Sequence, residues 1–210
     1  MYQFQTKSVK QRYPLFFKVA NIYRNRRFIE FKRQMKLQPN TKLLDVGGTY
    51  EFWENIHEFK NVTVLNITEN RSDENVRSVV YNGGEFPFEN SEFDVIFSNS
   101  TIEHVGDFWD QKLFASEVNR CGKQFFVQVP SYWFPYEPHA HIPFYQYMPA
   151  PMKIFLRKLI PKSLYSIEEL LSIRLLTKSE IRLLFPTASL VVTERMLGLP
   201  KSYYIIKNQK

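Results

Sequence analysis

The sequence LLDVGGT at Leu43–Thr49 decides the fold expected of this chain. A short apolar run with an acid near its end leads into two glycines, which is typical of a strand followed by a tight turn into a helix. Glycine lets the backbone come close to a ligand, so the pattern suits a nucleotide-like cofactor. The turn lacks the G-x-G-x-x-G spacing that dinucleotide-binding proteins use for pyrophosphate. A cofactor without pyrophosphate is therefore favoured over NAD.

Strands and helices are expected to alternate downstream of this stretch. Near-continuous apolar strands separated by helices predict an α/β fold with a mostly parallel sheet covered on both faces. The loops after the carboxyl ends of such strands form the ligand crevice. Two further runs joined by a tight turn predict a terminal antiparallel hairpin. The expected strands are Val62–Ile67, Val76–Tyr81, Phe93–Phe97 and Gln124–Val129, the helices Phe52–Phe59 and Trp109–Arg120, and the hairpin Ser189–Met196 with Ser202–Ile206.

The remaining segments are expected to flank this sheet within a single domain of residues 1–210. Residues 1–36 form a basic segment with helical spacing from about Ala20 onward. Residues 130–151 are too rich in proline and aromatics for a regular element, which is typical of a lid or binding loop. Residues 152–185 have amphipathic helical spacing interrupted at Pro161. The region 130–185 is therefore interpreted as a substrate lid with a helical insertion.

Charge is unevenly spread along the 210 residues. The formal net charge is +7, made up of +9 over residues 1–36, −9 over residues 37–149 and +7 over residues 150–210. The basic ends suggest an anionic partner, which would be a phosphate group, a membrane surface or a nucleic acid, or else they are helices on the outside of an acidic domain. The single cysteine, Cys121, excludes an internal disulfide framework and a multi-cysteine zinc site.

No membrane-spanning helix is expected, because no run of about 18 uncharged apolar residues occurs. The apolar patch at Leu15–Ile22 is broken by Lys18 and precedes no small-residue cleavage site, so no signal peptide is expected. Residues 151–160 combine an apolar stripe with basic residues, which suits an anionic membrane surface or a helix packed on the domain. The expected location is cytoplasmic, with peripheral contact at the inner face of the membrane as an option.

Four segments between Thr41 and Val129 resemble, in the right order, the class I S-adenosylmethionine-dependent methyltransferases of the small-molecule group. Leu43–Thr49 resembles the first cofactor motif of that family, and Glu89–Val105 closely resembles its fourth strand and the loop that follows. Val62–Thr68 resembles the second strand, and Asn82–Phe88 the Asp-Ala-x-x-Leu-Pro-Phe segment. The resemblance implies a Rossmann-like doubly wound sheet and S-adenosylmethionine as the cofactor.

The resemblance also implies roles for individual residues. Asp45 would lie near the amino group of the methionine part, Asn66 near the ribose hydroxyls, and Asn82 near the adenine. The glycine turn would expose backbone to the cofactor, and Ser98 with Asn99 would face the sulfonium side. The expected cofactor-binding residues are Asp45, Gly47, Gly48, Thr49, Asn66, Ile67, Asn82, Gly83, Ser98 and Asn99.

Three residues depart from the family pattern. Asn66 and Asn82 stand where acids are usual, and Thr49 stands at the third position of the glycine turn. An amide accepts hydrogen bonds without charge assistance, so each exchange is expected to weaken cofactor binding by about tenfold. These departures keep open a non-catalytic binding or scaffold protein on a degenerate methyltransferase fold.

Three histidines are candidate general bases for a nucleophile that must lose a proton. His104 lies in the loop after the fourth strand, and His139 and His141 lie after the fifth. Histidine suits the role because its ordinary pKa is near 6.5. Oxygen is the expected acceptor atom. A metal held by Glu137, His139 and His141 is conceivable, but no further ligand is evident in the sequence and no metal is expected.

The expected substrate residues are Glu103, Trp133 and Tyr136. Residues 130–151 resemble a loop of bacterial methyltransferases associated with surface-glycan and envelope genes. Their aromatic side chains would stack on a sugar, enclose a lipid-like acceptor, or form a small hydrophobic core under a lid. The acceptor is thus expected to be a small molecule, a glycan or a lipid-linked molecule. A nucleic-acid methyltransferase remains an alternative because of the basic N-terminal segment, but no nucleic-acid-binding module is recognisable.

Overall fold

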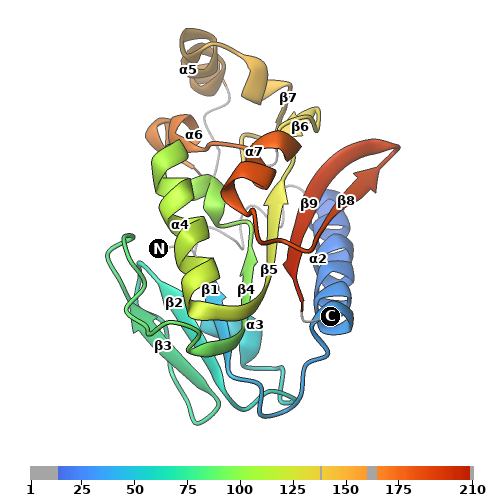
Figure 1. Ribbon diagram of the computed structural model, residues 1–210. Helices are drawn as coiled ribbons and strands as arrows, with labels where there is room; N and C mark the ends of the chain where they lie inside the picture. The colour runs from blue at the N-terminus through green and yellow to red at the C-terminus, as the bar shows by residue number, and fades with distance from the viewer. Residues whose placement is uncertain (1–13, 138, 160–164, 209–210) are drawn as a thin grey trace. The chain divides into compact units, whose positions relative to one another are not determined.

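The computed structural model describes residues 14–137, 139–159 and 165–208 (Figure 1). Contacts within the chain divide it into two compact units. The larger, which we call the sheet unit, comprises Gln34–Phe134 and Ile173–Lys210. The smaller, which we call the small unit, comprises the described parts of Met1–Arg33 and of Pro135–Ser172. Each unit is described by itself below.

The sheet unit is built on seven strands in the order β3-β2-β1-β4-β5-β9-β8. The first five strands along the chain pair in parallel, β9 runs antiparallel to β5, and β8 runs antiparallel to β9. This confirms the predicted α/β fold with its terminal antiparallel hairpin. The strands are β1 Leu43–Val46, β2 Val62–Asn66, β3 Val76–Val80, β4 Phe93–Asn99, β5 Gly122–Pro130, β8 Leu190–Met196 and β9 Leu199–Lys207.

Strand register brings the predicted cofactor residues to one edge of this sheet. Leu43 of β1 pairs with Val62 of β2 on one side and with Val95 of β4 on the other. The carboxyl ends of β1, β2 and β4 therefore lie beside one another, as expected where a parallel sheet binds a ligand. β1 is buried along its whole length, which explains why its sequence is a continuous apolar run apart from Asp45.

Helices of the sheet unit complete its hydrophobic core. α4 (Phe108–Cys121) packs against β4 and β5 and contacts α7 (Lys178–Leu184) (Figure 1). Its buried face includes Phe114 and Val118, which share the core with residues of the central strands. Asp107 begins α4 with a capping box, because its carboxylate accepts from the first-turn amides and Asp110 bonds back to the Asp107 amide.

The helix predicted over Phe52–Phe59 is wrong in extent. Only α3 (Tyr50–Trp53) is helical, and a turn follows in which the Ile56 amide donates to the Trp53 carbonyl. Trp53 and Phe59 are nevertheless both buried, with ring centroids 6.2 Å apart. The apolar spacing that predicted a helix is therefore satisfied by an aromatic cluster around a turn. The β2–β3 connection, residues 67–75, contains no helix or strand.

The small unit holds the flanking segments. α2 (Pro14–Met35), all but its last two residues, belongs to it, and its described part extends six residues before the predicted start. Residues 130–151 were expected to lack regular structure. Between the end of β5 and the start of α5, the described residues contain a short hairpin of β6 (Tyr136–Glu137) and β7 (Ile142–Pro143) and the 3₁₀ turn η2 (Tyr145–Tyr147). The amphipathic region continues as α5 (Ala150–Leu159) and α6 (Ile167–Ser172).

Pro161, the predicted helix interruption, lies outside the described residues. Among the helices of the described ranges, none combines the length and the apolarity needed to cross a bilayer.

Candidate functional site

Asp45 is a buried carboxyl group at the end of β1. Its side chain is only 2% exposed, and one carboxylate oxygen, Oδ2, accepts a hydrogen bond of 2.7 Å from the indole Nε1 of Trp53. Burial raises the pKa of Asp45 to about 7, while the Trp53 hydrogen bond acts in the opposite direction. A carboxyl group poised near neutrality is unusual among structural residues and marks this strand end as a functional candidate. Trp53 was not predicted as part of the site.

The two glycines after β1 are required by the side chains packed around them. Gly47 has a φ of +80°, and a Cβ there would lie 2.4 Å from the side chain of Thr101. A Cβ on Gly48 would lie 1.8 Å from Oδ2 of Asp45. Gly47 is nonetheless exposed. The turn therefore packs closely on protein atoms on one side and leaves backbone accessible to a ligand on the other.

Asn66 at the end of β2 stabilises the Gly47–Gly48 turn through side-chain hydrogen bonds. Its Nδ2 donates to the carbonyl of Gly48 at 2.8 Å, and its Oδ1 accepts from the amide and the hydroxyl of Thr68, both at 3.4 Å. A carboxylate has no donor for the Gly48 carbonyl. The asparagine that departs from the family pattern thus has a structural function that an acid would not perform. Thr49, at the N-cap position of α3, is exposed and makes no side-chain cap hydrogen bond.

In the loops after β2 and β3, the apolar side chain of Ile67 lies near the exposed backbone of Gly83. Ile67 is 65% exposed, and its Cγ2 is the one atom within 4 Å of where a Cβ on Gly83 would lie, at 3.9 Å. Gly83 has a φ of +88°, and Asn82 fixes the loop by accepting from the Gly84 amide at 3.0 Å. Ile67, Asn82 and Gly83 are all exposed, so this part of the edge is open to a flat, partly apolar group.

Hydroxyl groups join the end of β4 to the end of β1. The Oγ of Ser98 and the Oγ1 of Thr101 both donate to the carbonyl of Val46, at 3.0 and 3.1 Å. Ser98 is fully buried, so its hydroxyl serves the contact between the strands. Asn99 is half-buried at the strand end, next to the same contact. Thr101 was missed by the sequence analysis, although it lies inside the segment that most closely resembles the family.

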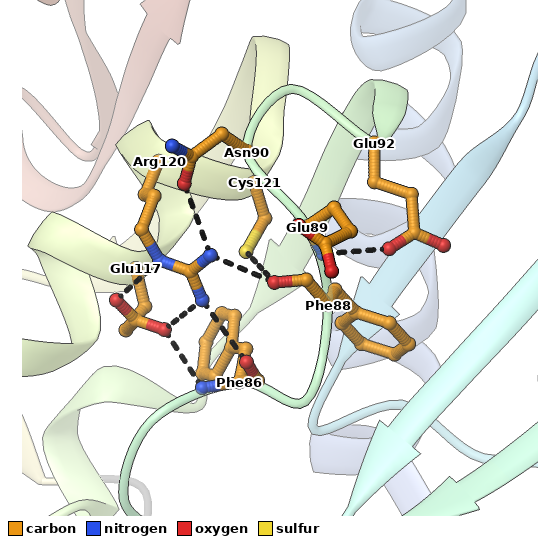
Figure 2. Close-up of polar contacts among 8 residues, drawn as sticks. All are labelled: Phe86, Phe88, Glu89, Asn90, Glu92, Glu117, Arg120 and Cys121. Carbon is orange, nitrogen blue, oxygen red and sulfur yellow. Dashed lines mark hydrogen bonds and ion pairs between the residues drawn. The ribbon is translucent and has the colours of Figure 1, made fainter.

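A closed hydrogen-bond network holds the loop that follows Asn82 and Gly83 (Figure 2). The guanidinium of Arg120 donates to the carbonyls of Phe86 and Phe88, at 3.0 and 2.7 Å, and to Asn90 Oδ1 at 3.2 Å. It also donates twice to the carboxylate of Glu117, which in turn accepts from the Phe86 amide at 2.8 Å. All five guanidinium N–H groups are thereby used. The network anchors the loop to the last turn of α4.

The loop after β4 carries two further predicted residues. His104 ends the 3₁₀ turn η1 (Ile102–His104) and is exposed. Glu103 is 1% exposed, and its carbonyl accepts from the Arg174 amide at 2.9 Å. Trp133, beyond the end of β5, is 56% exposed, and its ring makes an edge contact with Tyr132. All three belong to the sheet unit.

The small unit collects the remaining predicted residues around Glu137. The Glu137 carboxylate lies 2.6 Å from Nδ1 of His139 and accepts from the amides of His139 and Ala140 at 2.8 and 2.6 Å. Burial opposes ionisation of Glu137, but these hydrogen bonds and the charge of His139 outweigh it and hold its pKa below the ordinary value. Glu137 was considered in the sequence only as a metal ligand, and the structure gives it a partner in His139.

His141 lies in the same cluster with a different environment. It has a φ of +57°, its amide donates to the Glu137 carbonyl at 2.9 Å, and its Nδ1 lies 3.1 Å from the Tyr136 hydroxyl. Burial lowers the pKa of His141, with the charge of Glu137 acting in the opposite direction. The ten predicted cofactor residues thus gather in the sheet unit, whereas His139, His141 and Tyr136 gather in the small unit.

Comparison with known proteins gives a family model and a set of solved structures. Residues 44–124 match a model described as a methyltransferase domain. The protein PH0226 from Pyrococcus horikoshii OT3 has a similar structure, with a TM-score of 0.56 and 19% identity over 90% of this chain and 91% of that one. Among proteins with curated descriptions, none matches the sequence.

Two solved structures with described activities share the fold. A geranyl diphosphate C-methyltransferase from Streptomyces coelicolor A3(2) has a TM-score of 0.56 and 14% identity, over 89% of this chain and 78% of that one. A phosphoethanolamine N-methyltransferase from Haemonchus contortus has a TM-score of 0.56 and 15% identity, over 82% of this chain but 38% of that one. Both of these proteins were solved in complex with S-adenosylhomocysteine.

Proposed function

Since residues 44–124 form a methyltransferase domain whose cofactor is S-adenosylmethionine, we propose that the protein transfers a methyl group to a hydroxyl oxygen of a small-molecule acceptor. The observation that carries the proposal is the gathering of Asp45, the glycine turn, Asn66 and the Asn82–Gly83 loop at one edge of the sheet. These residues come from three separate segments of the sequence. The acceptor class includes sugars and lipid-linked molecules, for which exposed aromatic side chains are suited.

The edge offers a candidate partner for each part of the cofactor. The carboxylate of Asp45 would accept from the amino group of the methionine part, and Ile67 with the bare Gly83 backbone would contact the adenine. Asn66 would offer Oδ1 to the ribose, because its Nδ2 is already used on the Gly48 carbonyl. Of Ser98 and Asn99, only Asn99 is proposed to face the sulfonium side of the cofactor, because the Ser98 hydroxyl is buried and donates to the Val46 carbonyl. When bound, S-adenosylmethionine supplies an electrophilic methyl group.

A hydroxyl acceptor must lose its proton as its oxygen bonds to the methyl group, and His139 is our candidate for the general base. A carboxylate can only accept hydrogen bonds, so Nδ1 of His139 carries the proton that bonds to Glu137 and Nε2 is the basic nitrogen. Glu137 would act as a positioning residue that fixes the ring and stabilises the imidazolium once it forms.

A non-catalytic binding protein is the second candidate. It is favoured by the internal use of polar atoms on Asn66 and Ser98, which in this reading would serve only to stabilise the sheet edge. The two candidates differ in one property, which is affinity for the cofactor.

Calorimetric titration separates them. The purified chain is titrated with S-adenosylmethionine, with S-adenosylhomocysteine and with NADH as a control for nucleotides in general. We expect micromolar dissociation constants for the first two and no heat from NADH. The matched control is the variant Gly48→Ala, whose Cβ would displace the Asp45 carboxylate and abolish the heat. If neither S-adenosylmethionine nor S-adenosylhomocysteine binds to the unmodified protein, the non-catalytic binding protein becomes the favoured candidate.

A further inference from the structure

Helix α5 exposes a stripe of large apolar side chains. Met152, Phe155 and Leu159 are 48%, 60% and 63% exposed. Their spacing of three and then four residues places them on one face of the helix. Scattered exposed apolar residues are ordinary, but three consecutive members of one helical stripe form a continuous surface.

Basic residues flank this stripe, and α5 itself carries no acid. Lys158 is exposed one position before Leu159, and Lys153 follows Met152 on the other side of the stripe. Residues 138–167 contain no Asp or Glu. The cations of that range are Lys153, Arg157, Lys158 and Lys162. A helix with an apolar face and basic flanks is suited to a membrane surface, where anionic headgroups lie over an apolar acyl region.

An aromatic turn directly precedes the helix and adds to the exposed apolar surface. Phe144 is 56% exposed and Tyr147 is 39% exposed, with ring centroids 6.4 Å apart. Phe144 has a φ of +61°, a conformation that bulky residues rarely adopt. Core packing does not explain this strain, because the ring faces outward. Aromatic rings are the side chains that favour the interface between water and lipid.

The aromatic turn and α5 are joined within the small unit. The ammonium group of Lys153 lies 5.4 Å over the ring of Tyr145, which is 2% exposed. The amides of Met152 and Lys153 both donate to the Pro149 carbonyl at the start of the helix. The exposed side chains of the aromatic turn and those of the α5 stripe therefore belong to one segment that is held together by these contacts.

We propose that residues 144–159 bind the headgroup region of an anionic lipid bilayer, with Met152, Phe155 and Leu159 entering the acyl boundary. The basic flanks select this occupant over a second copy of the chain, which would bring its own cations against them. In this proposal the segment lies on the bilayer surface and does not cross the bilayer. The proposal is independent of methyl transfer, because lipid binding requires neither cofactor nor acceptor.

Vesicle flotation tests the proposal on the full chain without cofactor. The probes are vesicles of phosphatidylcholine alone and of phosphatidylcholine with phosphatidylglycerol in equal parts. We expect the protein to float with the anionic vesicles at low salt, to float less as salt increases, and to remain unbound with phosphatidylcholine alone.

The variant Phe155→Glu with Leu159→Glu is expected to lower partitioning onto anionic vesicles by about tenfold or more, because two apolar side chains lose their burial in lipid. The matched control is Leu183→Glu on α7, where Leu183 is 71% exposed, and this variant should float like the unmodified protein. Equal flotation of the double variant would overturn the proposal, as would failure to bind anionic vesicles. A dimer in sedimentation that the double variant dissociates, without vesicle binding, would assign the stripe to a second copy instead.

Discussion

At the scale of single residues, the site depends on polar groups whose environments are unusual. Asp45 is a carboxyl group with its pKa raised to about 7 by burial, and Asn66 is an amide that uses its donor on a backbone carbonyl. Both are expected to bind the cofactor, and both also determine the stability of the sheet edge. Cofactor binding and fold stability can be measured separately in variants that add or remove a charge at these two positions.

Asp45→Asn is expected to stabilise the fold at pH 8 while weakening S-adenosylmethionine binding. The folded state holds the Asp45 proton up to a pKa of about 7, compared with 3.8 for an unperturbed carboxyl group. The folded state therefore binds more protons, so stability is highest below the unperturbed value and falls as the pH rises through 7. At about 1.4 kcal/mol per pKa unit, the cost removed at pH 8 is at most about 4 kcal/mol.

Urea denaturation at pH 4 and pH 8 measures this effect, and calorimetry measures the binding. The control is Asp94→Asn, because the hydrogen bond from Lys123 lowers the pKa of the exposed Asp94 and removal of its charge should not stabilise the protein at pH 8. An equal gain for Asp45→Asn at both pH values would contradict the expectation.

Asn66→Asp is expected to lower the free energy of unfolding by about 1–3 kcal/mol, although it restores the acid usual in the family. The new carboxylate cannot donate to the Gly48 carbonyl and places a negative charge against it. Thermal or urea unfolding at pH 7.5 provides the measurement. Asn61→Asp, an exposed asparagine before β2, adds the same charge and should change stability by less than about 0.5 kcal/mol. Equal effects of the two variants would refute the structural role of Asn66.

At the scale of elements, the loop that presents Asn82 and Gly83 is held by its contact with the end of α4. Glu117 and Arg120 lie one helical turn apart and together bond to the amide and carbonyl of Phe86 and to the carbonyl of Phe88 (Figure 2). The hydrogen bond from Arg120 lowers the pKa of Glu117, so the contribution of this pair to stability is lost as the pH falls through that lowered value.

Arg120→Ala is expected to destabilise the protein by about 1–3 kcal/mol and to weaken cofactor binding, because Glu117 and two carbonyls lose their donor. Arg120→Lys should recover only part of the loss, since an ammonium group cannot reproduce the planar fork of five donors. Lys123→Ala is the control, because its ion pair with Asp94 is exposed and worth little. The measurements are urea denaturation and calorimetry. Unchanged stability and cofactor affinity of Arg120→Ala would exclude the anchoring role.

At the scale of the whole molecule, the predicted cofactor residues and the Glu137–His139 pair belong to different compact units. Substitutions in the small unit should therefore change turnover without changing cofactor affinity. The charge distribution follows the same division in part, since the acidic middle of the sequence contributes most of the sheet unit.

His139→Ala is expected to lower kcat by about 10²–10⁴-fold, the usual contribution of a general base, with an unchanged dissociation constant for S-adenosylhomocysteine. Glu137→Gln should give a smaller loss of kcat, because the amide keeps the ring in place but does not stabilise the imidazolium. Turnover with the acceptor, once identified, and calorimetry with S-adenosylhomocysteine provide the two readings. A His104→Ala variant serves as the comparison among the three histidines. Unchanged kcat for His139→Ala would remove it as the base.

The sequence determined the α/β class, the succession of strands along the chain and the terminal antiparallel hairpin, because these follow from local apolar runs and from turns such as the one in Leu43–Thr49. It overestimated the helix after Gly48, because helical spacing and a turn with buried Trp53 and Phe59 leave the same apolar pattern.

Only the tertiary structure decided which polar atoms are used internally. The bonds from Trp53 to Asp45, from Asn66 to Gly48 and from Arg120 to the 86–90 loop join residues separated by 8, 18 and at least 30 positions. Such contacts arise from strand register and helix packing, and local residue patterns carry no record of them. The contact between Glu137 and His139 is local, since it joins residues two positions apart, and only the structure showed it as a hydrogen-bonded pair rather than as two metal ligands.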